Sequence, residues 1–116
     1  MAGKKITVIY SDTARMTIKT IADFLRFRQI EHKSVIAKIL DEFEGKTMAF
    51  PEGSPICAEL LSLGCSKYRE CNTADGYRVL YSIASKSGGV VIHVNAVISQ
   101  RQSISGLLFS RIIEWQ

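Results

Sequence analysis

Three arginines and one histidine are the side chains of this sequence best suited to act on a phosphate group. Arg78 lies in the run YRVLYSI, Arg69 in KYREC and His93 in VVIHVNAVI, and Arg101 follows shortly after. A planar guanidinium suits a phosphate or a carboxylate. An imidazole titrates in the range that suits a general acid or base. These four residues are therefore the candidate catalytic side chains.

Each candidate also has an ordinary structural explanation. Arg78 could instead pair with Glu70 or another carboxylate across the sheet, and His93 could be a structural histidine on a strand. Arg101 could simply be exposed to solvent. If the strand register brings Arg69 near Arg78, the two form a phosphate clamp, but register cannot be read from one sequence.

Other chemistry finds little support in the residue pattern. The three cysteines, Cys57, Cys65 and Cys71, are an odd number with no zinc-site spacing, so buried thiols are expected rather than disulfides or a metal site. The sequence has no P-loop, GxGxxG, HExxH or GxSxG motif. We expect no cofactor and no metal.

A three-stranded antiparallel meander is expected to carry the candidate residues. Alternation of apolar and polar residues predicts strands at about 67–72, 77–84 and 90–98, with turns at Asp75-Gly76 and at Ser87-Gly88-Gly89. The residues expected in the core are Val79, Tyr81, Ile83 and Ile92. Arg78 has the opposite parity and is expected to project from an uncovered sheet face.

The rest of the chain predicts helices around that sheet. A first strand is expected at 4–10, then a helix capped at 11–13 that ends near 27–29, and a second helix that begins at 31–34 and stops at Gly45. One or two helical turns are expected within 56–63. A last helix, 104–114, has apolar residues on more than one face, which suggests a second contact: Ile104, Leu108, Phe109, Ile112 and Trp115.

This order predicts an α+β fold with a single domain over residues 1–116. The first strand must join the meander, because it is not stable alone. We expect a two-layer sandwich: a helical hairpin packed on one face of a mostly antiparallel four-stranded sheet, followed by a C-terminal helix.

Composition agrees with a soluble protein, for which we expect a cytoplasmic location and no membrane contact. Hydrophobic residues make up 47% and charged residues 22%, with a net charge of +4. Residues 67–116 hold six Lys and Arg against three Asp and Glu, so most of the positive excess lies with the expected sheet. A basic face can attract phosphate or an acidic partner.

The segments YRECNTADGYRVLYSI and VVIHVNAVISQRQS, with the layout around them, resemble the RelE/ParE superfamily of bacterial type II toxins. The resemblance implies a toxin neutralised by a cognate antitoxin, which alone contacts operator DNA. It also implies one of two activities. RelE-like members cut mRNA in the ribosome without a metal, whereas ParE-like members inhibit DNA gyrase.

The residues of the RelE-like pattern are only partly present. Arg78 and Arg69 match, and Arg101 matches if the alignment shifts by one residue past Gln100. Cys71 stands where a second basic residue is expected, and no tyrosine follows Tyr81. Loss of a cation and a tyrosine would cost several kcal/mol of transition-state stabilisation.

The resemblance therefore favours gyrase inhibition over mRNA cleavage by a small margin. In that case residues 100–116 would contact gyrase or the antitoxin. A family member that binds an antitoxin and harms nothing is a third possibility. On any toxic reading we expect Arg78→Ala to abolish toxicity while the fold stays intact.

Overall fold

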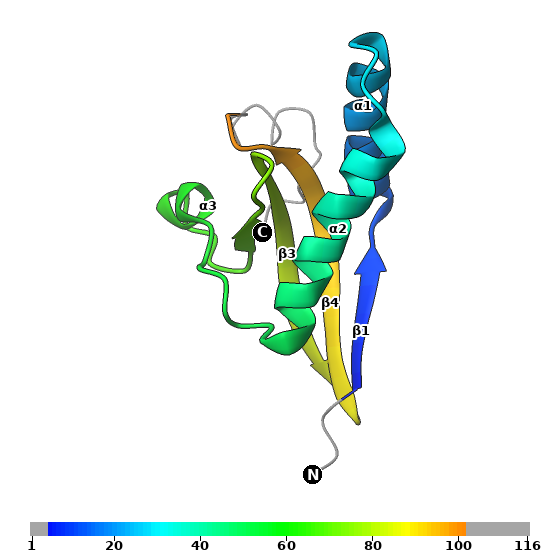
Figure 1. Cartoon of the computed structure of the whole chain (residues 1–116). Helices are drawn as coiled ribbons and strands as arrows, with labels where there is room; N and C mark the ends of the chain where they lie inside the picture. Colours follow the sequence, from blue (N-terminus) through cyan, green and yellow to red (C-terminus); the bar gives the residue numbers. More distant parts are fainter. Residues whose placement is uncertain (1–4, 102–116) are drawn as a thin grey trace.

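The computed structural model describes residues 5–101, which form four strands and three helices (Figure 1). In chain order the elements are β1 (Lys5–Tyr10), α1 (Asp12–Phe27), α2 (His32–Ala49), α3 (Ala58–Ser62), β2 (Arg69–Asn72), β3 (Tyr77–Lys86) and β4 (Gly89–Ser99). The expected α+β class, the helical hairpin and the four-stranded sheet are confirmed. The expected helix 104–114 lies outside the described residues.

The sheet has the strand order β1-β4-β3-β2. β2 and β3 are antiparallel, as are β3 and β4, so the predicted meander is correct. β1 joins the sheet as a parallel neighbour of β4, with Val8 opposite Ile92. A parallel pair needs a long crossover connection, and here the two long helices lie in it.

Local sequence signals explain where α1 begins and ends. Ser11 caps it, because the backbone N–H of Ala14 donates to Ser11 Oγ at 3.0 Å. After the helix, Gln29 takes a positive φ of 59°, which turns the chain toward α2. The short connection makes α1 and α2 the predicted hairpin.

The predicted stop of the second helix at Gly45 is wrong, since α2 runs on to Ala49. Gly45 faces open space, and a single helical glycine costs only about 1 kcal/mol relative to alanine. Burial beyond it offsets that cost: Thr47 is 1% exposed and donates to the carbonyl of Phe43. The helix ends just before Pro51, which disfavours helical geometry at Phe50.

The hairpin covers one face of the sheet and forms the larger core. The ring of Phe43 on α2 meets Tyr81 on β3 edge to face, with centroids 5.4 Å apart. Val79, Tyr81 and Ile92 are fully buried here as predicted, while Ile83 is half-buried.

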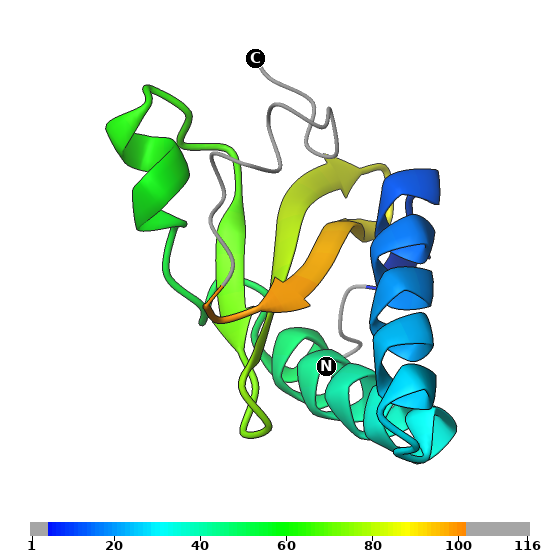
Figure 2. The same ribbon diagram turned by 90° about the horizontal axis from the view of Figure 1, so that it is seen from above.

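The other face carries a second, smaller core beneath α3. Leu60 of α3 packs with Leu80, Ala96 and Ile98 of the sheet, and all four are buried. Figure 2 shows the sheet between α3 on one side and the two long helices on the other. The expectation of a bare second face is therefore wrong at the β2–β3 end.

A β-bulge changes which side chains share a face. Leu80 pairs with Ala96 and Tyr81 pairs with Val94, so Asn95 has no partner on β3. Val94 and Val97 therefore both lie on the hairpin face although their numbers differ in parity.

Among the described residues, no helix has the length and apolar character needed to cross a bilayer.

Candidate functional site

Arg78 is held by two carboxylates beneath α3. Its Nη1 lies 2.7 Å from Glu59 Oε1 and 3.3 Å from Glu70 Oε2, and the residue is 7% exposed. Burial alone would lower the pKa of Arg78, but the hydrogen bond to Glu59 and the charge of Glu70 outweigh it and raise the pKa. Arg78 is thus a permanent cation neutralised inside the fold.

The expectation that Arg78 projects from an uncovered face is consequently wrong. The alternative pairing with Glu70 is what the structure contains. Glu59 was not predicted as a partner, because it comes from α3 and only the docking of that short helix brings it to the sheet. A buried guanidinium with two acidic neighbours offers little to a phosphate from outside.

Arg69 lies on the opposite face of the sheet from Arg78. It pairs with Tyr81 on β3, and paired residues of antiparallel strands project to the same side, here the hairpin side. Its Nη1 donates to the carbonyl oxygens of Ser54 at 2.7 Å and Glu52 at 3.3 Å. The phosphate clamp of Arg69 with Arg78 is therefore excluded by the register.

The Arg69 side chain instead secures the loop that follows α2. Beside it, the Tyr81 hydroxyl donates to the carbonyl of Pro51 at 2.7 Å. Burial is the main cause of a raised pKa at Tyr81, so this hydroxyl remains a donor to a higher pH than that of an ordinary tyrosine. The two side chains thus hold the Pro51 to Ser54 backbone against β2 and β3.

His93 is half-buried on the α3 face, but far from Arg78. It pairs with Ser82, which is four residues along β3 from Arg78, or about 13 Å. Arg101 is exposed just beyond β4, and its backbone N–H donates to Ser99 Oγ at 3.2 Å. The structure therefore does not gather the four candidate residues into one site.

Gln100, beside Arg101, has a structural task that the sequence did not indicate. Its Nε2 donates to the carbonyl oxygens of Thr73 at 3.1 Å and Tyr77 at 3.2 Å, while its backbone N–H donates to Gly76. The end of β4 is thereby fastened to the β2–β3 turn. This places Arg101 firmly at the surface as the one exposed cation of the four candidates.

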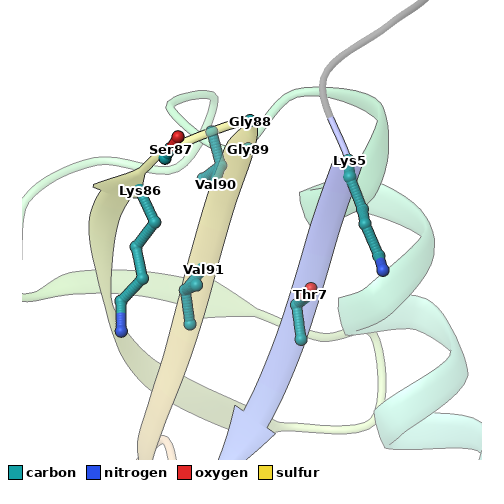
Figure 3. Close-up of a pocket in the computed structure, with 8 residues that line it drawn as sticks. All are labelled: Lys5, Thr7, Lys86, Ser87, Gly88, Gly89, Val90 and Val91. Atoms are coloured by element: carbon teal, nitrogen blue, oxygen red, sulfur yellow. The ribbon is translucent and has the colours of Figure 1, made fainter.

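Two hollows were not indicated by the sequence. The first, about 170 Å³, lies at the β3–β4 turn, where Figure 3 shows the side chains of Lys5 on β1 and Lys86 on β3, with β4 between these two strands. The close approach of strands there requires glycine at 89, since a Cβ would lie 2.3 Å from the carbonyl oxygen of Lys5. Two exposed lysines make this a weakly basic corner of the sheet.

The second hollow, about 460 Å³, lies on the hairpin side beyond the end of α2. Ile6, Met48, Pro51, Ile83 and Val90 line it together with Glu52 and Ser85. Its walls are mainly apolar, and its one charged group is a carboxylate. Such a groove suits an apolar side chain of a protein partner better than a phosphate.

Neither thiol nor metal chemistry gains support. Burial raises the pKa values of Cys57 and Cys71, so both remain neutral thiols rather than nucleophilic thiolates at neutral pH. Within residues 5–101, no cluster of three or more His, Cys, Asp or Glu side chains is arranged to hold a metal ion.

The C-terminal contact residues predicted from the sequence lie outside the described residues. They are Ile104, Leu108, Phe109, Ile112 and Trp115. In comparison with known proteins, residues 8–104 match a family model described as ParE toxin of type II toxin–antitoxin system, parDE. No curated protein matches the chain.

Proposed function

The chain belongs to the ParE toxin family of type II toxin–antitoxin systems, and from this premise we propose that it acts by binding and inhibiting DNA gyrase. Membership in the family implies a cognate antitoxin as a partner. The antitoxin would neutralise the toxin and would supply the only contact with operator DNA.

The observation that carries the proposal is the dispersal of the candidate catalytic cations. Metal-free cleavage of a phosphodiester needs several cations and an acid–base group within reach of one phosphate. Here Arg78 is neutralised by Glu59 and Glu70, and Arg69 is committed to backbone carbonyls on the other face. Inhibition by binding makes no such demand.

A protein-binding surface of mixed character also supports the proposal. The hollow at the end of α2 is mostly apolar, and Met48, one of its lining residues, is 47% exposed. We further propose that residues 100–116, with Arg101 and the apolar residues Phe109 and Trp115, contribute to the contact with gyrase or the antitoxin.

The direct test compares two reactions with the same purified full-length chain. We expect the chain to block supercoiling of a relaxed plasmid by gyrase and to leave mRNA intact in a translation extract. Cut mRNA with unimpaired supercoiling would overturn the proposal in favour of the ribosome-dependent nuclease. Neither effect from a folded chain would identify a non-toxic member that only binds an antitoxin.

The proposed contact segment is tested by Trp115→Ala beside a matched control, Leu61→Ala. Leu61 is an apolar residue on α3 that is 51% exposed. We expect at least about a tenfold weaker inhibition for Trp115→Ala, as for loss of an aromatic anchor, and no change for Leu61→Ala. Equal inhibition by both variants would place the gyrase contact elsewhere.

A further inference from the structure

We propose that helix α1 is a self-association surface, on which a second copy of this chain packs with its own α1 in antiparallel orientation. The starting observation is an apolar stripe that remains exposed. Met16 is 65%, Phe24 54% and Phe27 84% exposed. Three large apolar side chains on one helix are an unusual solvent-facing set.

These residues lie on one helical face together with two threonines. Thr13, Met16, Thr20, Phe24 and Phe27 follow one another at spacings of three, four, four and three residues, which keeps them on a single stripe. This spacing reads the same in both directions about Thr20. In an antiparallel pair centred there, Met16 would lie beside Phe24 of the second copy, and Thr20 would meet its own counterpart.

Four of the five charged residues on the flank of the stripe show the same symmetry with opposite sign, and the fifth, Lys19, would meet the Lys19 of the second copy. Asp12, Arg15, Lys19, Asp23 and Arg26 repeat the spacing of three, four, four and three. About Lys19, the acid Asp12 mirrors the base Arg26, and the base Arg15 mirrors the acid Asp23. In a two-fold antiparallel helix pair each flank meets its own copy, so every one of these four charges would face an opposite charge.

The charges are available for such a contact. Side chains on this flank are well exposed, at 97% for Asp12, 70% for Arg15 and 59% for Arg26. They now form pairs within their own helix, as Arg15 does with Asp12 at 3.3 Å. Exposed ion pairs of this kind contribute little to stability. Exchanging them for pairs with a second copy therefore costs little free energy.

The remainder of α1 is already fixed in the fold. Ala14, Thr17 and Leu25 are buried toward β4 and α2, and Figure 2 shows α1 along one side of the molecule with its outer flank away from the sheet. The helix has 16 residues and a length of about 24 Å. A contact of that length is small, so we expect a dimer with micromolar affinity.

Charge-swapped variants of the full chain test the proposal directly. Arg15→Asp places like charges opposite each other in a homodimer, and so does Asp23→Arg. Mixed together, the two variants restore both opposite-charge contacts. We expect sedimentation equilibrium to show each variant alone dimerising about tenfold more weakly than wild type, and the mixture returning to within about threefold of it.

Failure of the mixture to recover, with both variants folded by circular dichroism, would overturn the antiparallel arrangement. A wild-type chain that stays monomeric at several hundred micromolar would overturn self-association itself. In that case the stripe would be left to a different protein partner.

A disulfide trap gives an independent readout at the symmetry axis. Thr20→Cys should form a covalent dimer under mild oxidation, because each Thr20 faces its counterpart. Ser87→Cys, at the exposed β3–β4 turn, is the matched control and should remain monomeric. The native thiols of Cys57, Cys65 and Cys71 are buried, and the wild-type chain oxidised in parallel accounts for any cross-link that they form. Equal cross-linking of both variants would overturn the proposed axis.

Discussion

Arg78 links the short helix α3 to the sheet, in addition to the backbone hydrogen bonds that join residues 55–57 to Tyr68 and Glu70. Its guanidinium binds Glu70 on β2 and Glu59 on α3, so the charge of one side chain holds the short helix to the sheet. Removal of one partner from a buried ion pair is costly, because the remaining charges lose their compensation. Replacement of Arg78 therefore lowers the stability of the fold, whatever its effect on the binding of a target.

We accordingly predict that Arg78→Ala lowers the free energy of unfolding by about 3 kcal/mol. Arg101→Ala, which removes an exposed arginine at the end of β4, should change it by less than about 0.5 kcal/mol. Urea unfolding followed by circular dichroism measures both. Lost toxicity in Arg78→Ala would then report unfolding, and equal stabilities of the two variants would contradict the structural role.

A second prediction concerns Tyr10, whose hydroxyl donates to the carboxylate of Glu44 on α2. Burial first, and then the hydrogen bond and charge of Glu44, raise the pKa of Tyr10 far above its ordinary value near 10. The folded state thus keeps a proton that the unfolded state releases above that pH. The resulting stability is fully present below pH 10 and is lost as the pH rises beyond it.

In Tyr10→Phe this alkaline loss should be smaller, whereas at neutral pH the variant should be about 1 kcal/mol less stable than wild type. The measurement is the unfolding free energy at a series of pH values from 7 to 11. Parallel curves for the two proteins would show that Tyr10 does not titrate differently in the folded state.

At the scale of elements, one threonine of α1 adds a hydrogen bond to the apolar packing of this helix on the sheet. Beyond Val94, β4 has no β1 residue beside it, and the backbone N–H of Val97 donates to Thr17 Oγ1 at 3.0 Å. The same hydroxyl donates to the carbonyl of Ala14 at 2.7 Å. The helix therefore completes the hydrogen bonding of a strand edge that would otherwise be buried unpaired.

Thr17→Val keeps the shape and removes this bond, so we predict a loss of about 1–3 kcal/mol in stability. Thr20→Val is the matched control on the same helix, where the hydroxyl is exposed and donates only to the carbonyl of Met16. Thermal unfolding at low protein concentration compares them. A cost for Thr20→Val equal to that of Thr17→Val would indicate a general effect of valine in the helix.

Features that depend on residues close in the sequence could be predicted from the sequence. Features that depend on contacts between distant segments, such as the pairing of two strands, could not. The helix cap expected at 11–13 depends only on neighbouring residues, and it is confirmed at Ser11. The end of α2 was missed because burial of Thr47 outweighs the weak signal of Gly45. The face of the sheet on which Arg69 lies depends on the register between β2 and β3. The residue pattern of a single strand does not determine that register.

At the scale of the whole molecule, the sheet separates two cores of unequal size. Cys57 and Cys65 are buried with α3 on one face, and Cys71 is buried beneath the hairpin on the other. α3 has only five residues, and its N-terminus has no side-chain cap. A short helix of this kind opens at a lower free energy than a large core.

The three thiols can report this difference, and we predict that Cys57 and Cys65 react with a thiol reagent in native buffer faster than Cys71. Mass spectrometry of peptides after timed labelling resolves the three sites. Labelling of all three at one rate would mean that both cores open together in a single unfolding event.

The bulge at Asn95 also bears on how the length of this chain can vary. Since Val94 and Ala96 pair with consecutive residues of β3, Asn95 is the one residue of β4 without a cross-strand partner on β3. Its removal would leave every cross-strand partner in place and every neighbouring side chain on its present face. Relatives one residue shorter at this point could thus share the whole architecture. A one-residue gap at position 95 of an alignment would then mark the absence of the bulge and no other structural difference.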